Sequence, residues 1–267
     1  MKHKFLFILL FSLVLEGMVT TQAVAGDYVH QVNTLIGTKG TGLTSGYLYP
    51  GATYPYGMVQ FTPSYFSKRS GFVINQLSGG GCEHMGNFPT FPVKGKLKMS
   101  PDNILNYRIN VSEEKGHAGY YEAMVQEDIK AKLTVTERTG MASYEYPADQ
   151  QYGTIIIGGG ISATPIEQAA IVITAPNKCE GYAEGGNFCG LRTPYKVYFV
   201  AEFDTDALES GTWKRDELKP NTTFAEGEYS GVYFTFDVNK KKNIQYKIGV
   251  SYVSVENARE NLKAENT

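Results

Sequence analysis

This sequence has few cysteines, a single tryptophan and no large excess of charge of either sign. Its 267 residues include three cysteines and one tryptophan, with 25 basic against 27 acidic residues. Because the charges nearly cancel, the sequence offers no electrostatic basis for binding nucleic acid. Cys82, Glu83 and His84 look like a metal-binding fragment, but no second cluster at ligand spacing follows, which argues against a zinc site. We expect Cys82 and His84 to brace a loop instead.

Long hydrophobic runs are also missing beyond the N-terminus. Residues 5–15 form an apolar run behind Lys2 and Lys4, but this run is too short to span a bilayer. Small residues at 23–25 then complete the pattern of a secretory signal with its cleavage site. We therefore expect residues 1–25 to be a signal peptide and the protein to be exported, either periplasmic or secreted, with no membrane insertion after cleavage.

The three cysteines cannot all pair with one another. Cys179 and Cys189 flank a glycine-rich segment and form one candidate disulfide, which leaves Cys82 free. Cys82 with Cys189 is the other candidate, and the sequence leaves both open. In either case we expect at least one free thiol.

Helical periodicity is absent before residue 254. Short segments instead alternate apolar with polar residues and are rich in β-branched and aromatic side chains, which predicts half-buried strands. Residues 166–170 alone suggest a turn of helix. Many strands with regular turns, and neither a repeat nor a linker between them, predict a single β-sandwich domain. The predicted strands are residues 57–62, 131–136, 141–146, 154–157, 195–203, 231–238 and 244–252.

An amphipathic helix is predicted at the end of the chain. Ser254 is placed to cap its first turn, and Val255, Ala258 and Leu262 recur at helical spacing. The sequence shows no partner for this apolar stripe. We therefore expect the helix to lead into a further domain.

Few residue patterns here are typical of a reaction centre. The glycine triplets at 79–81 and 158–160 precede neither a Lys-Ser/Thr pair nor a helix, which argues against a phosphate site. Hydrolysis of a glycosidic bond needs two carboxyl groups that face one bond, and we assign no acidic pair of this chain to that role. The segment around Phe188 and Cys189 is different, because an aromatic ring framed by glycines suits stacking on a sugar. A tight turn with Phe188 filling the core is the alternative.

Several segments form an ordered set along the chain: residues 32–38, 49–61, 77–82 with 86–87, 116–121, 133–140, 187–190 and 254–262. Together they resemble the N-terminal domain of glycoside hydrolase family 92, the calcium-dependent exo-acting α-mannosidases. The resemblance implies an all-β fold, a large β-sandwich (supersandwich) of the galactose-mutarotase-like type. It also implies that a linker helix leads into an (α/α)6 domain that this sequence lacks. The expected boundaries are therefore 27–253 for the sandwich and 254–267 for the start of the linker.

The same resemblance implies an activity and a set of residue roles. The whole protein is expected to be an exported, calcium-dependent, inverting α-mannosidase that acts on mannose-containing glycans such as N-glycans or mannan. The catalytic carboxylates and most calcium ligands are expected in the missing C-terminal catalytic domain, so the chain alone is expected to be truncated and inactive. Phe188 and Cys189 are expected to bind the sugar, with Gly37 and Thr38 lining the pocket and no catalytic or metal-binding residue in this chain. The alternative is a stand-alone carbohydrate-binding module without hydrolase activity.

One position departs from the pattern of many family members. They carry a tryptophan and a Ser-His-Thr-His run before the glycine-rich segment, whereas this chain has Asn75 and Gln76 there and its single tryptophan at position 213. This departure bears on the sugar linkage that the protein prefers.

Overall fold

The computed structural model describes residue 28 and residues 31–38, 48–64, 71–77, 79, 82, 84–104 and 111–267. Residues Val32–Thr267 form one compact unit, and Met1–Gln31 form another, of which only Tyr28 and Gln31 are described. The predicted signal peptide lies outside the described residues. The larger unit contains all the strands and helices named below.

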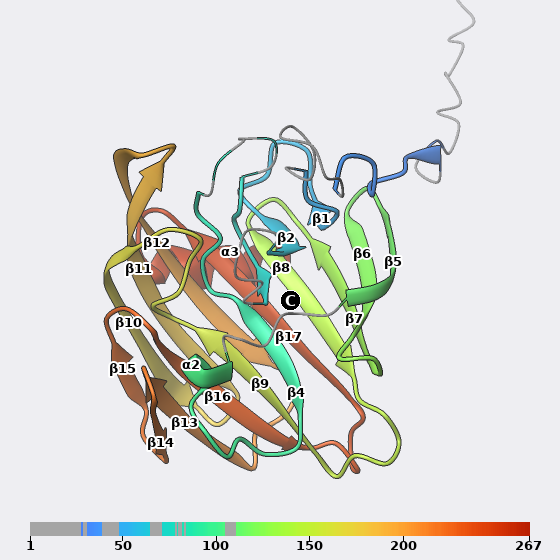
Figure 1. The fold of residues 1–267 in the computed structure, drawn as a ribbon, viewed down its shortest axis with the longest axis vertical. Coiled ribbons are helices and arrows are strands. Elements are labelled where there is room, and N and C mark those ends of the chain that lie inside the picture. The colour runs from blue at the N-terminus through green and yellow to red at the C-terminus, as the bar shows by residue number, and fades with distance from the viewer. Residues whose placement is uncertain are drawn as a thin grey trace, which may run out of the picture. The chain divides into compact units, whose positions relative to one another are not determined.

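Two antiparallel sheets make up this unit, as the alternating sequence patterns predict (Figure 1). The strands of the first sheet are β1 (Ala52–Thr53), β2 (Gln60–Pro63), β3 (Phe72–Val73), β4 (Thr90–Lys94), β9 (Tyr152–Gly158), β13 (Glu209–Lys214), β14 (Glu217–Pro220) and β16 (Ser230–Asp237). Among the described residues they form an eight-stranded sheet in the order β1-β2-β3-β4-β9-β16-β13-β14. The all-β sandwich expected from the sequence is confirmed.

The second sheet has nine strands among the described residues, in the order β15-β10-β11-β12-β17-β8-β7-β6-β5. In the part of the chain that the structure describes, the helices are α2 (Pro101–Ile104) and α3 (Val255–Glu265). The strands are β5 (Val111–His117), β6 (Tyr120–Val125), β7 (Ile129–Val135), β8 (Thr139–Glu145), β10 (Ile166–Ala175), β11 (Lys178–Phe188), β12 (Leu191–Phe203), β15 (Phe224–Glu226) and β17 (Asn243–Ser251).

All seven strand segments predicted from the sequence overlap strands of the structure, but the turn of helix at 166–170 is wrong. Those residues begin β10, whose pairing with β11 shifts register between Ile166 and Gln168. The irregularity leaves two consecutive residues exposed, so Ile166 and Ala169 face the core three positions apart. That spacing imitates one turn of a helix.

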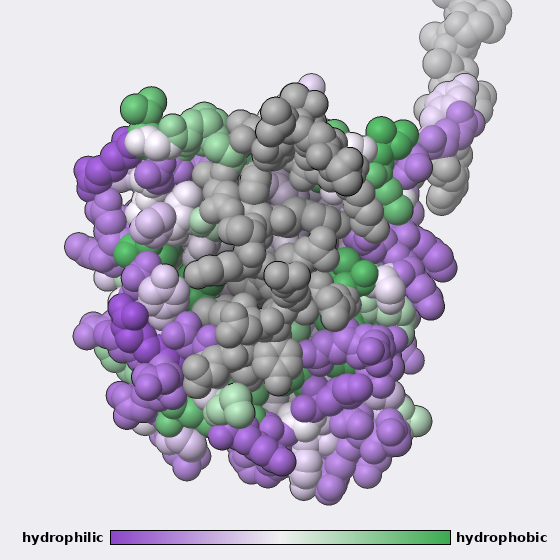
Figure 2. Space-filling view, viewed as in Figure 1, coloured by the Kyte–Doolittle hydropathy of each residue, from purple (hydrophilic) through white to green (hydrophobic). Residues whose placement is uncertain are grey.

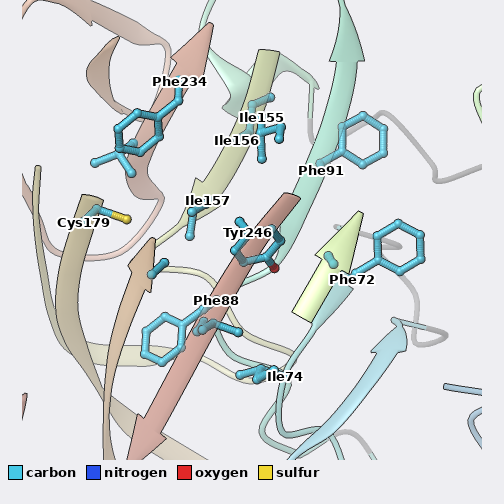
Figure 3. Packing of buried hydrophobic residues seen from close by; sticks show 14 of the residues in the cluster. Phe72, Ile74, Phe88, Phe91, Ile155, Ile156, Ile157, Cys179, Phe234 and Tyr246 are labelled. Atoms are coloured by element: carbon cyan, nitrogen blue, oxygen red, sulfur yellow. The ribbon is translucent and has the colours of Figure 1, made fainter. Parts of the chain in front are cut away.

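The core between the sheets contains many aromatic side chains. Phe203 of the nine-stranded sheet packs against Phe234 of the eight-stranded sheet, with ring centroids 4.9 Å apart, and against Tyr246 of its own sheet at 5.6 Å. Figure 3 shows Tyr246 and Phe234 in this layer together with the isoleucines of β9. The Tyr246 hydroxyl donates to Thr90 Oγ1 at 2.7 Å, and burial raises its pKa well above the usual value. Tyr246 therefore serves packing, because a buried phenol is stable when its hydroxyl has a partner.

Helix α3 packs against the sandwich, so the expectation that its apolar stripe has no partner is wrong. Ser254 caps the helix as predicted, and its side chain accepts a hydrogen bond from Asn257 N. Ala258 and Leu262 are buried against Val200 of β12, with Val255 beside them. This contact is close, because a Cβ added at Gly249 of β17 would lie 2.5 Å from the Ala258 carbonyl oxygen. The stripe therefore gives no evidence for a further domain.

Candidate functional site

The segment expected to contact sugar forms the tip of a long hairpin. Phe188 ends β11 and pairs with Leu191 at the start of β12, so only Cys189 and Gly190 form the turn. Both turn residues have positive φ, 52° and 85°, as a two-residue hairpin turn of type I′ requires. Gly190 N also donates to Asn187 Oδ1 at 2.8 Å. The segment is therefore strand and tight turn, and it holds Phe188 at a fixed place.

A disulfide joins this tip to the glycine-rich segment. Cys82 and Cys189 are bonded with their Cα atoms 5.5 Å apart, and Cys179 is free and buried. The second candidate pairing and the free thiol are confirmed, whereas the pairing of Cys179 with Cys189 is wrong. The reason is strand geometry: ten residues along an extended strand separate two Cα atoms by about 33 Å, far beyond disulfide reach.

His84 strengthens the same connection. Its Nδ1 atom lies 3.1 Å from the Asn187 carbonyl oxygen. Its ring makes edge contacts with Phe188 and Tyr195, at centroid distances of 5.1 and 5.7 Å. The bracing role expected for Cys82 and His84 is confirmed. Phe188 is partly exposed and lies outside the hydrophobic core, so the alternative that it fills the core is wrong.

A buried polar layer lies beside the brace. Asn75 and Asn87 exchange hydrogen bonds, from Asn87 N to Asn75 Oδ1 at 2.7 Å and from Asn75 Nδ2 to Asn87 Oδ1 at 3.1 Å. Tyr195 donates to Asn87 Oδ1 at 2.6 Å, and burial raises the pKa of its hydroxyl. Asn75 also reaches Tyr252, just before α3, at 3.4 Å. This layer connects the base of the hairpin tip to the start of the helix.

Only part of this layer is apparent from the sequence. Asn75 and Gln76, which depart from the pattern of many family members, are both buried. Neither amide atom of the Gln76 side chain, nor Nδ2 of Asn87, has a hydrogen-bond partner among the described residues. Asn87 and Tyr195 were missed, because their partners lie far apart in the chain. The sequence feature that could have drawn attention to Asn87 is its place directly after a glycine, Gly86.

Gly37 and Thr38 lie in a separate turn. Thr38 is buried, and its hydroxyl donates to the Leu35 carbonyl at 2.8 Å. Gly37 has a φ of +79°, and a Cβ there would lie 2.6 Å from Leu48 Cδ1. Leu48 also lies 3.5 Å from the Cβ position of Gly79. The turn therefore comes close to the glycine-rich segment, while its expected pocket-lining role stays a prediction.

Several acidic residues form ion pairs with lysines. Asp128 pairs with Lys94 at 2.9 Å and Asp204 pairs with Lys241 at 2.8 Å. Among the described residues, no three or more His, Cys, Asp or Glu side chains are grouped in a way that could hold a metal ion. This part of the chain also contains no helix long and apolar enough to cross a membrane.

Figure 2 shows one face of the molecule. Where residues are coloured, hydrophilic side chains cover most of the face and hydrophobic ones occur in small patches. No single apolar patch dominates the coloured part of this view.

Comparison with known proteins places the chain in a family. An uncharacterized secreted glycosidase of Arthroderma benhamiae is 24% identical, with 95% of this chain and 37% of the relative covered. A GH92 α-mannosidase of Bacteroides thetaiotaomicron, solved with mannoimidazole, superposes with a TM-score of 0.75 at 24% identity, covering 89% of this chain and 34% of that one.

A second solved enzyme, an inverting GH92 mannosidase of the same organism, gives a TM-score of 0.73 at 23% identity, over 90% of this chain and 33% of that one. The chain therefore spans about a third of the length of these relatives. The sequence profile of the glycosyl hydrolase family 92 N-terminal domain matches residues 31–251, and the chain belongs to this family.

Proposed function

We propose that this domain contributes sugar-binding residues to the substrate pocket of an exported, inverting α-mannosidase that acts on mannose-containing glycans. The observation that carries the proposal is the partly exposed Phe188, held at a hairpin tip by the Cys82–Cys189 disulfide and by His84. A fixed aromatic ring offers a flat apolar face to the C–H side of a sugar, and its rigidity keeps the entropic cost of binding low.

Relatives support the substrate class. The matched solved structures are named as mannosidases, and one holds mannoimidazole. A disulfide and the expected signal peptide both agree with export, since disulfides persist in oxidising compartments. The secreted relative points the same way.

Catalysis is assigned to residues outside this chain. Hydrolysis with inversion needs two carboxyl groups about 6.5–9.5 Å apart, with room for a water molecule between them. By family resemblance, those groups lie in the part of the relatives that this chain does not span. In this arrangement Phe188 orients the sugar, and the backbone at Cys189 borders it.

Calcium is a proposal from family resemblance alone. Calcium takes six to eight oxygen ligands, and the described residues offer no such grouping, because acids such as Asp128 and Asp204 are paired with lysines. The residues present therefore do not fit the ion, and no step of the binding mechanism involves it.

A stand-alone carbohydrate-binding module is the second candidate function. Burial of the α3 stripe against β12 favours it, because this domain covers its own apolar helix face. Phe188 has the same role in both candidates. The two differ in whether hydrolysis accompanies binding.

Titration of the chain with an α-mannoside tests the proposed site. We expect Phe188→Ala to weaken binding about three- to tenfold, the range that loss of one aromatic contact gives. Calorimetry measures the affinity, and an aryl α-mannoside assay of the same sample should show no turnover. Phe224→Ala is the matched control, because Phe224 is an exposed aromatic residue on the edge strand β15. Equal affinities for the wild type and Phe188→Ala, or turnover by this chain, would contradict the proposal.

A further inference from the structure

An exposed tyrosine stands in a strained turn between β1 and β2. Gly57 N donates to the Tyr54 carbonyl at 3.0 Å, which closes a four-residue turn with Pro55 in its second position. Tyr56 occupies the third position with a φ of 62°. A proline followed by a residue of positive φ is the pattern of a type II turn, whose third position favours glycine.

Tyr56 has no structural compensation for this conformation. A side chain in the left-handed region costs about 1–2 kcal/mol. Its ring is fully exposed, and among the described residues no ring, cation or hydrogen-bond contact engages the side chain. Strained residues of this kind concentrate at functional sites, where the strain holds a group in a useful place. Glycine would fit the backbone better, so the presence of a tyrosine side chain needs an explanation.

The turn is firmly attached to the sandwich. Met58 N donates to the Glu137 carbonyl at 2.7 Å, and a Cβ added at Gly57 would lie 3.0 Å from that same oxygen. Tyr54 is also half exposed, and the Glu137 side chain is exposed beside the turn. Two phenol rings and a carboxylate are thus presented on a rigid backbone.

These groups have the chemistry of a sugar contact. A tyrosine ring stacks on the C–H face of a pyranose, and phenol and carboxylate oxygens accept hydrogen bonds from sugar hydroxyls. Tyrosine has only two side-chain torsions, so little conformational entropy is lost on binding. An apolar protein partner fits less well, because the turn combines its rings with polar atoms.

The turn and the Phe188 hairpin lie at the same end of the nine-stranded sheet (Figure 1). Thr139, which begins β8 just after the β7–β8 turn, pairs with Gly249, and the neighbouring Ser251 pairs with Tyr198 on the hairpin. Met58 contacts that β7–β8 turn through Glu137. From β7 to β12 there are three strand spacings, about 14 Å across the sheet, and the hairpin tip lies seven residues, about 23 Å, further along β12 than Tyr198. A glycan of several sugars is long enough to reach both places.

We propose that Tyr56, with Tyr54, forms a second sugar-contact site that binds a more distant sugar of the glycan held at Phe188. The inference rests on the proposed function for the identity of the glycan. The site itself rests on the strained turn. A single sugar held at Phe188 does not reach the turn, whereas a longer glycan does.

Calorimetric titration of the 267-residue chain with α-methyl mannoside and with linear mannooligosaccharides of increasing length tests the proposal. We expect Tyr56→Gly to leave the affinity for the monosaccharide within about twofold and to weaken the longer ligands about three- to tenfold. Tyr56→Phe keeps the ring and should restore most of that affinity. The midpoint of thermal unfolding of Tyr56→Gly should stay level or rise, because the strain is removed.

Phe188→Ala and the control variant Phe224→Ala are titrated with the same ligands. If Phe188→Ala has no effect while Tyr56→Gly weakens the long ligands, the function proposed at the hairpin fails and the second site stands. If Tyr56→Gly binds every ligand as the wild type does, or weakens the monosaccharide as much as the long ligands, the second site is overturned. Absence of oligosaccharide binding by the wild type overturns it as well.

Discussion

Replacing Cys82 and Cys189 together with serine is expected to lower the free energy of unfolding by about 3–5 kcal/mol. The disulfide joins residues 107 positions apart, so it removes a large amount of conformational freedom from the unfolded chain. A closed loop of about 100 residues corresponds to about 4.7 kcal/mol in the chain-entropy description. The bond also fixes the hairpin tip that carries Phe188, so the double variant should bind an α-mannoside more weakly.

Urea denaturation with and without a reducing agent measures this effect. Reductant should shift the wild type to the stability of the double variant and leave the double variant unchanged. Cys179→Ala is the control, because Cys179 is buried and unpaired, and its response to reductant should match that of the wild type. A double variant as stable as the wild type would show that the bond contributes nothing to the fold.

Gly231→Ala is expected to destabilise the sandwich by about 3 kcal/mol or more, or to prevent folding. Gly231 lies in β16, between β9 and β13 of the eight-stranded sheet. An added Cβ would lie 2.2 Å from Trp213 Cη2 and 2.4 Å from the Ile157 carbonyl oxygen. The tryptophan ring is fully buried and the carbonyl belongs to a paired strand, so neither gives way easily.

Thermal unfolding of the purified variants, together with their soluble yield, checks this prediction. Gly119→Asn is the matched control, since nothing lies within 4 Å of a Cβ at Gly119. Its φ of +77° is one that asparagine tolerates, so its midpoint should stay close to that of the wild type. A Gly231→Ala variant as stable as Gly119→Asn would contradict the close packing of Trp213 on β16.

The strands predicted from the sequence include half-buried ones and, in β9 and β16, strands buried on both faces. β17 alternates buried and partly exposed residues over its first half, and the segment predicted at 244–252 matches it closely. β5 was missed because it lies at the sheet edge and exposes most of its polar residues. β10 was misread because a register shift breaks its alternation. Periodicity therefore fails at edges and bulges. It was not recognised everywhere else either, since β6 and most of β11 alternate buried and partly exposed residues and were not among the predicted strands.

The candidate site was predictable by residue type but not by geometry. Phe188 and Cys189 stand out in the sequence as an aromatic ring and a thiol framed by glycines, yet the glycines before them suggest a loop. In the structure those glycines serve close strand contact, since a Cβ at Gly185 would lie 2.5 Å from the Pro165 carbonyl. The contact of Tyr195 with Asn87 spans 108 positions, and no local pattern reveals such a pair.

Helix α3 shows a related limit of local pattern. Its cap and its apolar spacing are predictable from Ser254 onward, because both depend on residues three or four positions apart. The partner of the apolar stripe is not predictable in this way, because Val200 lies more than fifty residues earlier in the chain. An amphipathic helix shows that a partner exists and leaves open which surface provides it.

Sugar binding at the β11–β12 hairpin tip is tested most directly by amide NMR during titration with α-methyl mannoside. We expect the amide signals of Phe188, Cys189 and Gly190 to shift with a common saturation curve, while those of β13 and β14 in the other sheet stay in place. Shifts confined to other parts of the sandwich, or none at saturating ligand, would contradict a sugar site at the hairpin tip.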